Sequence, residues 1–210
     1  MIIAIDGPAA SGKGTLAKRI AAQLGLPHLD TGLLYRAVAR ALIDATLPLN
    51  DERAAIRAAE TLTLDALDPE KLRGAQAGEA ASRIAAIPAV RRAILELQRA
   101  FGRQPGGAVL DGRDIGTVVC PQADVKLFVT ASLEERAKRR WRELVLSGAP
   151  LDYEMVLADI KRRDERDSLR SVSPLVQASD ATLLDTTELS SDAAFARALE
   201  LIRVKTEQPV

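Results

Sequence analysis

The residues with the clearest chemical purpose lie near the start of the chain, where small residues surround one lysine. Residues 7–15 read Gly-Pro-Ala-Ala-Ser-Gly-Lys-Gly-Thr and fit the pattern G-x-x-x-x-G-K. Small side chains in such a loop let successive backbone N–H groups point inward, where they can hold a polyphosphate. Lys13 can then reach the β and γ phosphates, and a hydroxyl helps to place Mg²⁺. That hydroxyl usually follows the lysine directly, but here Gly14 intervenes and Thr15 supplies it.

A second group of charged residues follows the apolar run 108–110 and reads Asp111-Gly-Arg-Asp-Ile-Gly-Thr117. Two carboxylates and an arginine within four residues, set among glycines, would make a poor helix or strand. Glycines allow a ligand to approach the backbone closely, and the charges can meet a phosphate or a metal. The pattern therefore indicates a site at the end of a strand.

Arginines also gather in two later helical segments. Arg136, Arg139 and Arg140 share one helix face by their spacing. In the segment 161–170, the residues Arg163, Asp167 and Arg170 fall at i, i+4 and i+7 and would share a side if the helix persists. Such charge runs are usual on solvated faces with local ion pairs. Two arginine-bearing helices around a short loop also suit a lid that folds over phosphates, and spacing alone leaves both interpretations open.

Alternating strands and helices must position these residues. The apolar, β-branched run 1–6 predicts a strand that stops at a glycine, and the helix after the loop, running to Leu24, turns its positive dipole end toward the phosphates. Strands are predicted at 28–30, 108–110, 125–129 and 181–185, with helices between them. This alternation predicts an α/β fold with a parallel sheet covered on both faces, in which ligands bind at the carboxyl ends of the strands.

Helix boundaries can be predicted from breakers and caps. Helices are expected at 33–45, 51–64, 80–86 and about 90–101, then from the capping box Ser132 to Glu135 as far as Gly148, from about Tyr153, and from Ser191 as a cap onward. The segment 70–79 shows only weak periodicity. We found no repeats or linkers.

Composition limits the classes of function. The chain has 210 residues, of which 47% are apolar, and its 29 basic side chains equal its 29 acidic ones. No global positive field favours nucleic acid or an anionic membrane. The single Cys120 excludes an intrachain disulfide and is expected to be structural, and the single His28 excludes a histidine-rich metal site. No apolar run approaches about 18 residues. We expect a cytoplasmic monomer.

Four segments together resemble the bacterial cytidylate kinases, over nearly the whole chain. These segments are 5–15, Leu29-Asp-Thr-Gly-Leu-Leu-Tyr-Arg36, Asp111-Gly-Arg-Asp-Ile-Gly-Thr-Val-Val119 and Arg163-Asp-Glu-Arg-Asp167. The resemblance implies a P-loop NTPase fold with a five-stranded parallel sheet, and transfer of the ATP γ-phosphate to CMP or dCMP with Mg²⁺. It also implies a single domain, 1–210. Its core would be 1–34, 104–141 and 171–210, its helical nucleoside-monophosphate lobe about 35–103, and its lid about 142–170.

The same resemblance implies roles for individual residues. ATP would be bound by Gly7, Pro8, Ala9, Ala10, Ser11, Gly12, Lys13, Gly14 and Thr15, the last also serving Mg²⁺. The CMP phosphate would be held by Arg36, Arg113 and Arg163, beside Thr31. Positions that recognise the base match Ser82, Arg91, Asp114 and Arg170, and positions near the nucleoside match Tyr35 and Asp167. Asp111 would orient Arg113 or a metal-bound water. Candidates for contact with the transferring phosphoryl group are Arg139, Arg140 and Arg163, which the sequence does not rank; Lys13 and Arg113 complete the catalytic set.

Cytosine presents an amino donor beside two acceptors, so a carboxylate such as Asp114 can accept from the amine while arginines donate to the acceptors. Uracil reverses that edge, and mispaired buried polar groups reject a near-isostere. The segment 61–76 is shorter than the β-rich insertion of longer bacterial members and has no clear hairpin, which leaves CMP affinity and closure open. The alternatives are a kinase for another acceptor, such as UMP, AMP, dTMP or shikimate, and a nucleotide-dependent switch.

Overall fold

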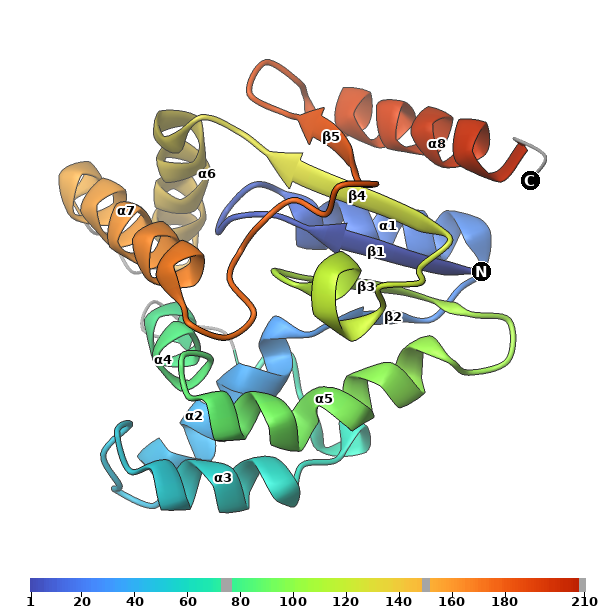
Figure 1. Ribbon diagram of the computed structural model, residues 1–210. Coiled ribbons are helices and arrows are strands. Elements are labelled where there is room, and N and C mark those ends of the chain that lie inside the picture. Colours follow the sequence, from blue (N-terminus) through green and yellow to red (C-terminus); the bar gives the residue numbers. More distant parts are fainter. Residues whose placement is uncertain (73–76, 149–151, 208–210) are drawn as a thin grey trace. The chain divides into compact units, whose positions relative to one another are not determined.

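The computed structural model, which describes residues 1–72, 77–148 and 152–207, contains a five-stranded parallel sheet (Figure 1). The strands are β1 (Ile2–Asp6), β2 (His28–Asp30), β3 (Ala108–Gly112), β4 (Val125–Thr130) and β5 (Thr182–Asp185), in the spatial order β2-β3-β1-β4-β5. Strand β1 pairs in parallel with both β3 and β4. The predicted α/β class and the five-stranded parallel sheet are confirmed.

The chain divides into two compact units, residues 1–29 with 99–210, and residues 30–98. The first unit holds most of the sheet, and the second consists of helices and connections. The functional lobes expected at 35–103 and 142–170 remain predictions, because a division by compactness does not test what a segment binds.

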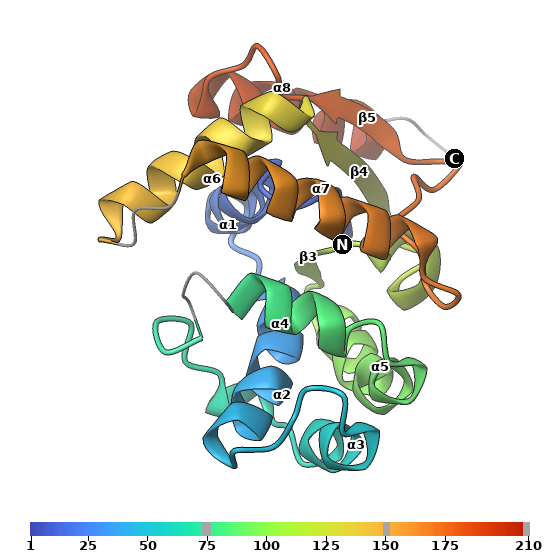
Figure 2. The ribbon, with the colours of Figure 1, turned by 90° about the vertical axis from the view of Figure 1, so that its left-hand side faces the viewer.

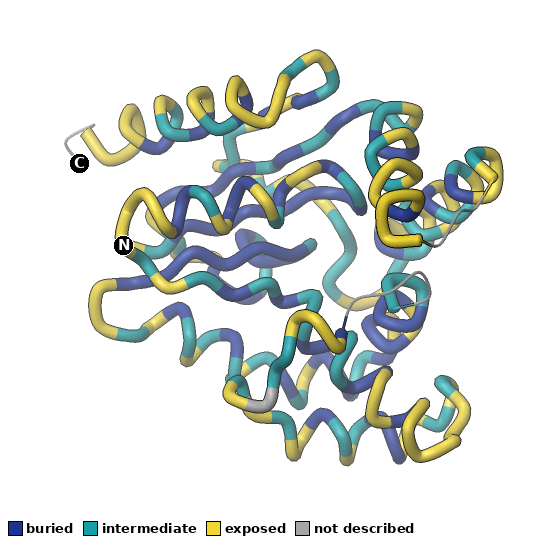
Figure 3. The backbone as a smooth tube through the Cα atoms, turned by 180° about the vertical axis from the view of Figure 1, so that it is seen from behind, coloured by how far each residue is buried: buried dark blue, intermediate teal, exposed yellow. Residues whose placement is uncertain are grey.

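The core of the first unit lies between the sheet and two helices, α1 (Lys13–Leu24) and α8 (Ser191–Glu207). Ile3 and Ile5 of β1 are 0% exposed and pack with Ile20 of α1. Strands buried on both faces need apolar side chains at successive positions, and β1 supplies them. Figure 3 shows the strands as mostly buried and the outer face of α8 as exposed. Cys120 is buried, and burial raises the pKa of its thiol, in keeping with a structural role.

Two further helices of the first unit, α6 (Leu133–Leu146) and α7 (Tyr153–Leu169), pack on each other (Figure 2). Their contact buries Ala137 and Leu144 of α6 against Val156 and Ile160 of α7. The predicted N-cap is confirmed, since Ser132 Oγ accepts a hydrogen bond from the backbone N–H of Glu135 at 3.2 Å. The reciprocal half of the predicted capping box does not form, because the backbone N–H of Ser132 donates to Thr187 Oγ1 at 2.9 Å. Helix α6 ends at Leu146, and the predicted breaker Gly148-Ala-Pro lies partly outside the described residues.

The second unit is built from α2 (Gly32–Asp44), α3 (Glu52–Glu60), a 3₁₀ turn η1 (Leu64–Ala66), α4 (Ala77–Ile84) and most of α5 (Pro88–Gly102). Its buried side chains include Leu34, Val38, Ile84 and Val90. Pro88 begins α5, because the first helical position needs no N–H donor. The segment 61–72 contains no strand, as expected for a chain without the insertion; residues 73–76 lie outside the described residues.

Several predicted boundaries are wrong. Ser190, not Ser191, caps α8, because its Oγ accepts from the backbone N–H of Ala193 at 3.1 Å. Helix α7 ends at Leu169, and Arg170 has an extended backbone, so the expected i, i+7 alignment of Arg170 does not form. Residues Ile115–Val119 form a short π-helix, η2, that the sequence did not indicate. Across the described ranges, no helix is both long and apolar enough to cross a bilayer.

Candidate active site

The loop 7–12 between β1 and α1 is shaped by its glycines. A Cβ on Gly7 would lie 2.0 Å from the carbonyl oxygen of Val129 on β4, so only glycine lets the chain leave the sheet here. Gly12 precedes α1 with φ +85°, a left-handed conformation that glycine adopts without strain. The predicted strand, loop and helix are thus all present. The backbone N–H groups of the first turn of α1 lie directly after this loop.

Lys13 is buried within the loop that it is expected to serve. Its Nζ donates a hydrogen bond to the carbonyl oxygen of Pro8 at 3.2 Å. Ser11 Oγ is buried and has no hydrogen-bond partner among the described residues, whereas Thr15 is exposed in the first turn of α1. A loop with inward polar atoms, a helix N-terminus and a lysine suits a polyphosphate.

Asp6, directly before this loop, is a buried acid whose pKa is raised. Its carboxylate is 5% exposed and accepts hydrogen bonds from the backbone N–H groups of Ile115, at 2.8 Å, and Gly116, at 2.7 Å. The pKa of Asp6 is raised to about 6, mainly because the carboxyl group is buried, and the negative charge of nearby Asp114 adds to this effect. The two N–H donors and the positive charge of Lys13 lower the pKa but do not outweigh burial. Sequence reasoning assigned Asp6 no role.

Asp111 lies at the end of β3 and contacts the only histidine. Nε2 of His28 is 2.8 Å from Asp111 Oδ1, within hydrogen-bond distance. The other carboxylate oxygen lies 3.7 Å from the position a Cβ would take on Gly14, which places Asp111 beside the first turn of α1. His28, expected as a plain strand residue, therefore fixes one oxygen of a predicted site carboxylate.

Three arginines surround Asp167 on α7. Arg113 Nε donates to Asp167 Oδ2 at 3.0 Å, and the side chains are 15% and 4% exposed. Burial alone would raise the pKa of Asp167, but the positive charges of Arg113, Arg163 and Arg170 outweigh it and hold the pKa below its usual range. The structure thus brings together four predicted residues from two segments of the first unit into a cationic cluster suited to an anion.

The arginines of α6 differ in their surroundings. Arg139 donates two hydrogen bonds to Thr186. Its Nη1 donates to Oγ1 at 2.9 Å, and its Nη2 donates to the carbonyl oxygen at 2.6 Å. Nη1 also lies 3.9 Å from the position that a Cβ on Gly12 would take. Arg140 pairs at 2.9 Å with the exposed Glu143. Of these two candidates, Arg139 is the one that lies beside the phosphate-binding loop.

Arg136, which shares their face, is buried and has a structural part that the sequence did not reveal. It donates to the carbonyl oxygens of Ala131, at 2.9 Å, and Ala9, at 3.2 Å, and pairs with Asp164 of α7 at 2.6 Å. One side chain therefore joins the loop 7–12 to both helices of the α6–α7 pair.

The second unit holds the remaining predicted residues. Arg36 pairs with Asp30, whose other carboxylate oxygen accepts from Gly32 N at 2.9 Å. The buried guanidinium of Arg91 donates to the carbonyl oxygen of Ala85 at 3.3 Å and lies 5.2 Å from the ring centroid of Tyr35. The last two of this set, Thr31 before α2 and Ser82 on α4, are each 3% exposed. The residues predicted to recognise the base are divided between the units, with Ser82 and Arg91 in the second and Asp114 and Arg170 in the first.

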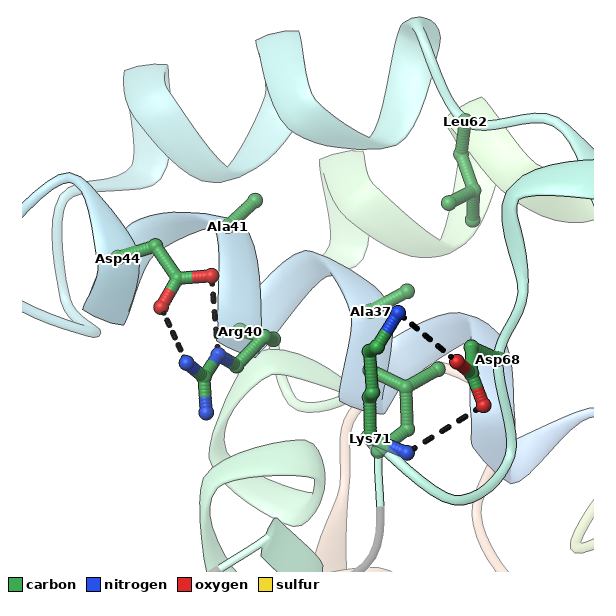
Figure 4. A pocket seen from close by; sticks show the side chains of 8 residues that line it. Ala37, Arg40, Ala41, Asp44, Leu62, Asp68 and Lys71 are labelled. Carbon is green, nitrogen blue, oxygen red and sulfur yellow. Dashed lines mark hydrogen bonds and ion pairs between the residues drawn. The ribbon is translucent and has the colours of Figure 1, made fainter.

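A pocket of ≈ 590 Å³ in the second unit contains none of the predicted residues (Figure 4). Its cations are paired with acids of its own lining, Arg40 with Asp44 at 2.7 Å and Lys71 with Asp68 at 3.2 Å. The remaining lining residues are Ala37, Ala41, Leu62 and Leu72. The charged side chains of this pocket are therefore paired with one another, and its other lining residues are apolar.

Known proteins provide an independent comparison. The family model described as cytidylate kinase matches residues 3–204. The chain is 63% identical over 205 residues to a cytidylate kinase of Xanthobacter autotrophicus, covering 98% of each chain. It is 62% identical over 202 residues to a cytidylate kinase of Azorhizobium caulinodans, covering 96% of this chain and 98% of that one.

Solved structures support the fold. The crystal structure of TT1252 from Thermus thermophilus shares 25% identity with a TM-score of 0.51, over 99% of this chain and 98% of that one. An uncharacterized protein from Eubacterium ventriosum, 15% identical with a TM-score of 0.55 over 97% and 98%, shares the fold. The cytidylate kinase model matches almost the whole chain, and the two relatives named above are similar to it along nearly their full length. This protein therefore belongs to the cytidylate kinase family.

Proposed function

We propose that this protein transfers the γ-phosphoryl group of ATP to CMP or dCMP, which gives CDP or dCDP and ADP. The observation that carries the proposal is that one unit combines a polyphosphate loop with the arginine cluster around Asp167. Such a pair of sites suits an enzyme that holds a donor phosphate and an acceptor phosphate. The cytidylate kinases similar to this chain support the choice of acceptor.

In this proposal the donor is bound by residues 7–15. Backbone N–H groups of the loop and of the first turn of α1 hold the phosphates, and Lys13 exchanges its contact with Pro8 for a phosphate oxygen. Arg139, held by Thr186 beside Gly12, is the arginine that we assign to the transferring group ahead of Arg140. Charge stabilisation and alignment are sufficient, because phosphoryl transfer needs little covalent help from the protein.

The acceptor phosphate is held by Arg113 and Arg163 of the first unit and by Arg36 of the second, with Thr31 beside it. Tyr35, Ser82 and Arg91 in the second unit, and Asp114, Asp167 and Arg170 in the first, bind the nucleoside. Asp114 accepts from the cytosine amino group and so disfavours uracil. The attacking phosphate oxygen is already ionised, and Asp111 therefore acts by orientation rather than as a base. In these roles residues 35–103 form the acceptor lobe and 142–170 the lid, which excludes water.

Mg²⁺ fits the residues present as a partner of ATP. Among the described residues, no group of three or more acidic, histidine or cysteine side chains could hold a metal by itself. Mg²⁺ usually keeps several waters and binds substrate phosphates with few protein ligands, which this donor set suits. The ion would neutralise charge on the β and γ phosphates, Thr15 would hold it, and Asp111 would hold one of its waters. We propose that one chain suffices, as a cytoplasmic monomer.

The test is ADP formation from Mg-ATP in a coupled assay, with CMP, dCMP, UMP, AMP or no acceptor in parallel. We expect strong turnover with CMP and dCMP, weak turnover with UMP, and background without an acceptor. Faster turnover with AMP or UMP than with CMP would be consistent with ATP binding by residues 7–15 but would exclude the proposed role of Asp114. Equal turnover with no acceptor would favour a nucleotide-dependent switch.

A further inference from the structure

Thr186, directly after β5, is bonded to two other segments of the first unit. Its backbone N–H donates to the carbonyl oxygen of Thr130, at the end of β4, at 2.8 Å. Its own carbonyl oxygen accepts from Nη2 of Arg139 on α6 at 2.6 Å, and its hydroxyl oxygen accepts from Nη1 of the same arginine at 2.9 Å. Thr186 is 3% exposed, so these bonds are made away from water.

The hydroxyl of Thr186 also has a proton to donate, and two carbonyl oxygens lie within reach of it. Oγ1 is 3.0 Å from the oxygen of Thr130 and 3.3 Å from the oxygen of Ser11 in the loop 7–12. A hydroxyl donates one hydrogen bond and can still accept others, so its contact with Arg139 is compatible with either donation. Because the backbone is fixed to β4 and a β-branched side chain has a restricted χ1, the acceptor stays in one place.

The guanidinium of Arg139 binds Thr186 as a fork. Its two terminal nitrogens contact two oxygens of one residue, and its Nε donates to Oε1 of Glu135 at 3.1 Å. A guanidinium has five N–H groups, so these three bonds, made among the described residues, leave one N–H on each terminal nitrogen. Arg139 is thus held in a fixed position and still has donors for an anion.

We propose that Thr186 is a positioning residue for phosphoryl transfer, which holds Arg139 beside the phosphate-binding loop so that its remaining N–H groups meet the transferring group. This inference rests on the proposed function, in which Arg139 is assigned to that group. The location supports it, because Nη1 lies 3.9 Å from the position that a Cβ on Gly12 would take. A donor that is already in place stabilises developing charge without having to be ordered during the reaction.

The test replaces Thr186 by valine, which keeps the shape of the side chain and removes the hydroxyl. Nη1 of Arg139 then loses its acceptor, whereas the backbone carbonyl still accepts from Nη2. Phosphoryl transfer is measured in a single turnover by rapid quench, because product release can limit kcat. With saturating Mg-ATP and CMP we expect the rate to fall about tenfold, which corresponds to about 1.4 kcal/mol in the barrier. The KM values for ATP and CMP should change less than about twofold, because the lost interaction acts in the transition state.

The outcomes of this comparison separate three alternatives. An unchanged single-turnover rate would show that Arg139 does not need Thr186, and a faster rate would show that Thr186 holds the arginine away from the reacting group. A higher KM for ATP with an unchanged rate would mean that the hydroxyl acts on the loop through Ser11. Each of these results would overturn the inference. If the wild type transfers no phosphoryl group to CMP, the proposed function fails instead.

Thr187→Val is the matched control. The hydroxyl of Thr187 donates to Oδ1 of Asp185 at 2.6 Å and accepts from the backbone N–H of Ser132, before α6, at 2.9 Å. The control therefore loses a bonded hydroxyl from the same turn without touching Arg139. Its single-turnover rate should stay within about twofold of the wild type. An equal fall in both variants would show that any loosening of this turn slows the reaction, which contradicts the proposal.

Thr186→Ser tests whether the hydroxyl or the methyl group matters. Serine restores the acceptor, and the rate should return to within about threefold of the wild type, the remainder reflecting the freer χ1 of serine. A serine variant as slow as the valine variant would mean that packing of the methyl group supports the reaction, and would refute the proposed role. If Thr186→Val does not fold, as judged by circular dichroism, Thr186→Ala removes the same hydroxyl without setting a methyl group against the guanidinium. The same fall is expected for it, and a folded alanine variant with the wild-type rate would count against the proposal.

A double-mutant cycle tests whether Thr186 acts through Arg139. Arg139→Met removes the guanidinium, so adding Thr186→Val in that background should change the single-turnover rate less than about twofold. An equal fall on adding Thr186→Val to the wild type and to Arg139→Met would show that the two residues act independently, and the inference would be wrong.

Discussion

The contribution of Asp6 to the free energy of unfolding depends on pH. Its pKa is raised to about 6 in the folded protein, first by burial, from an ordinary value of 3.8. The folded state therefore binds this proton more tightly than the unfolded state, so the free energy of unfolding gains from this group as the pH falls through about 6 toward 4. The gain is on the order of 3 kcal/mol, since one pKa unit corresponds to about 1.4 kcal/mol.

We expect the difference in unfolding free energy between wild type and Asp6→Asn to shift in favour of the wild type as the pH falls from 7 to 4. Urea denaturation of both proteins at several pH values measures it, and taking the difference cancels the titration of groups such as Asp167, whose lowered pKa acts in the opposite sense. A difference that stays constant with pH would contradict the raised pKa.

Local pattern predicted some site residues and missed others for a definable reason. The loop residues 7–15 carry their chemistry in their own spacing, and the loop is found where expected. Asp6 and Arg136 act through partners 109 and 127 residues away, Ile115 and Ala9, so no local pattern could indicate them. Only the identity of Asp6, a charged residue at the end of an apolar strand, gave a signal.

One buried cation joins the α6–α7 pair to the phosphate loop by a hydrogen bond, beside the packing of Ala10 against the same pair. Arg136 is 6% exposed and meets Ala9, Ala131 and Asp164. We expect Arg136→Met to lower the free energy of unfolding by about 3–5 kcal/mol, because removal of one partner leaves an uncompensated charge on Asp164. It should also raise the KM for ATP, since the carbonyl of Ala9 loses its donor.

Arg140→Met is the control for this prediction, measured by the same urea denaturation and initial-rate assays. Arg140 lies on the same helix and pairs with Glu143, whose side chain is 65% exposed. Surface pairs contribute about 0–1 kcal/mol, so this variant should remain close to the wild type in stability. Equal losses in the two variants would mean that burial of Arg136 is not what stabilises the pair.

Helices and strands could be predicted where apolar periodicity and capping residues indicate the same element. They were harder to predict where contacts with distant residues determine the local structure. The five strands and the cap of α6 follow from apolar runs and from Ser132. The helix η2 could not be predicted, because its first donors are satisfied by another strand. Apolar and polar residues alternate briefly over 62–67, yet Leu64–Ala66 form a 3₁₀ turn, since a short alternation without a neighbouring strand has nothing to pair with.

Over the whole molecule, the proposed roles assign ligands to the two compact units differently. ATP residues all belong to the first unit, whereas the acceptor residues are divided between both. We expect Mg-ATP alone to slow amide exchange in 7–15, and CMP alone to slow it in 31–36 and 82–91. Hydrogen exchange measured by mass spectrometry tests this, with α3 (Glu52–Glu60), which carries no assigned residue, as the internal control. Protection by CMP confined to the first unit would exclude residues 35–103 as an acceptor lobe.

The central position of β1 has a consequence for synthesis on the ribosome. Ile3 and Ile5 are fully buried, yet their strand partners, from Val109 on β3 and Val125 on β4 onward, are translated much later. At roughly 5–20 residues per second, the first strand waits on the order of 10 s before a neighbour emerges. Residues 30–98, the compact second unit, emerge meanwhile and can close a core of their own. Nascent chains halted before residue 108 would therefore carry an apolar strand with both edges open, the form most exposed to aggregation and to capture by chaperones.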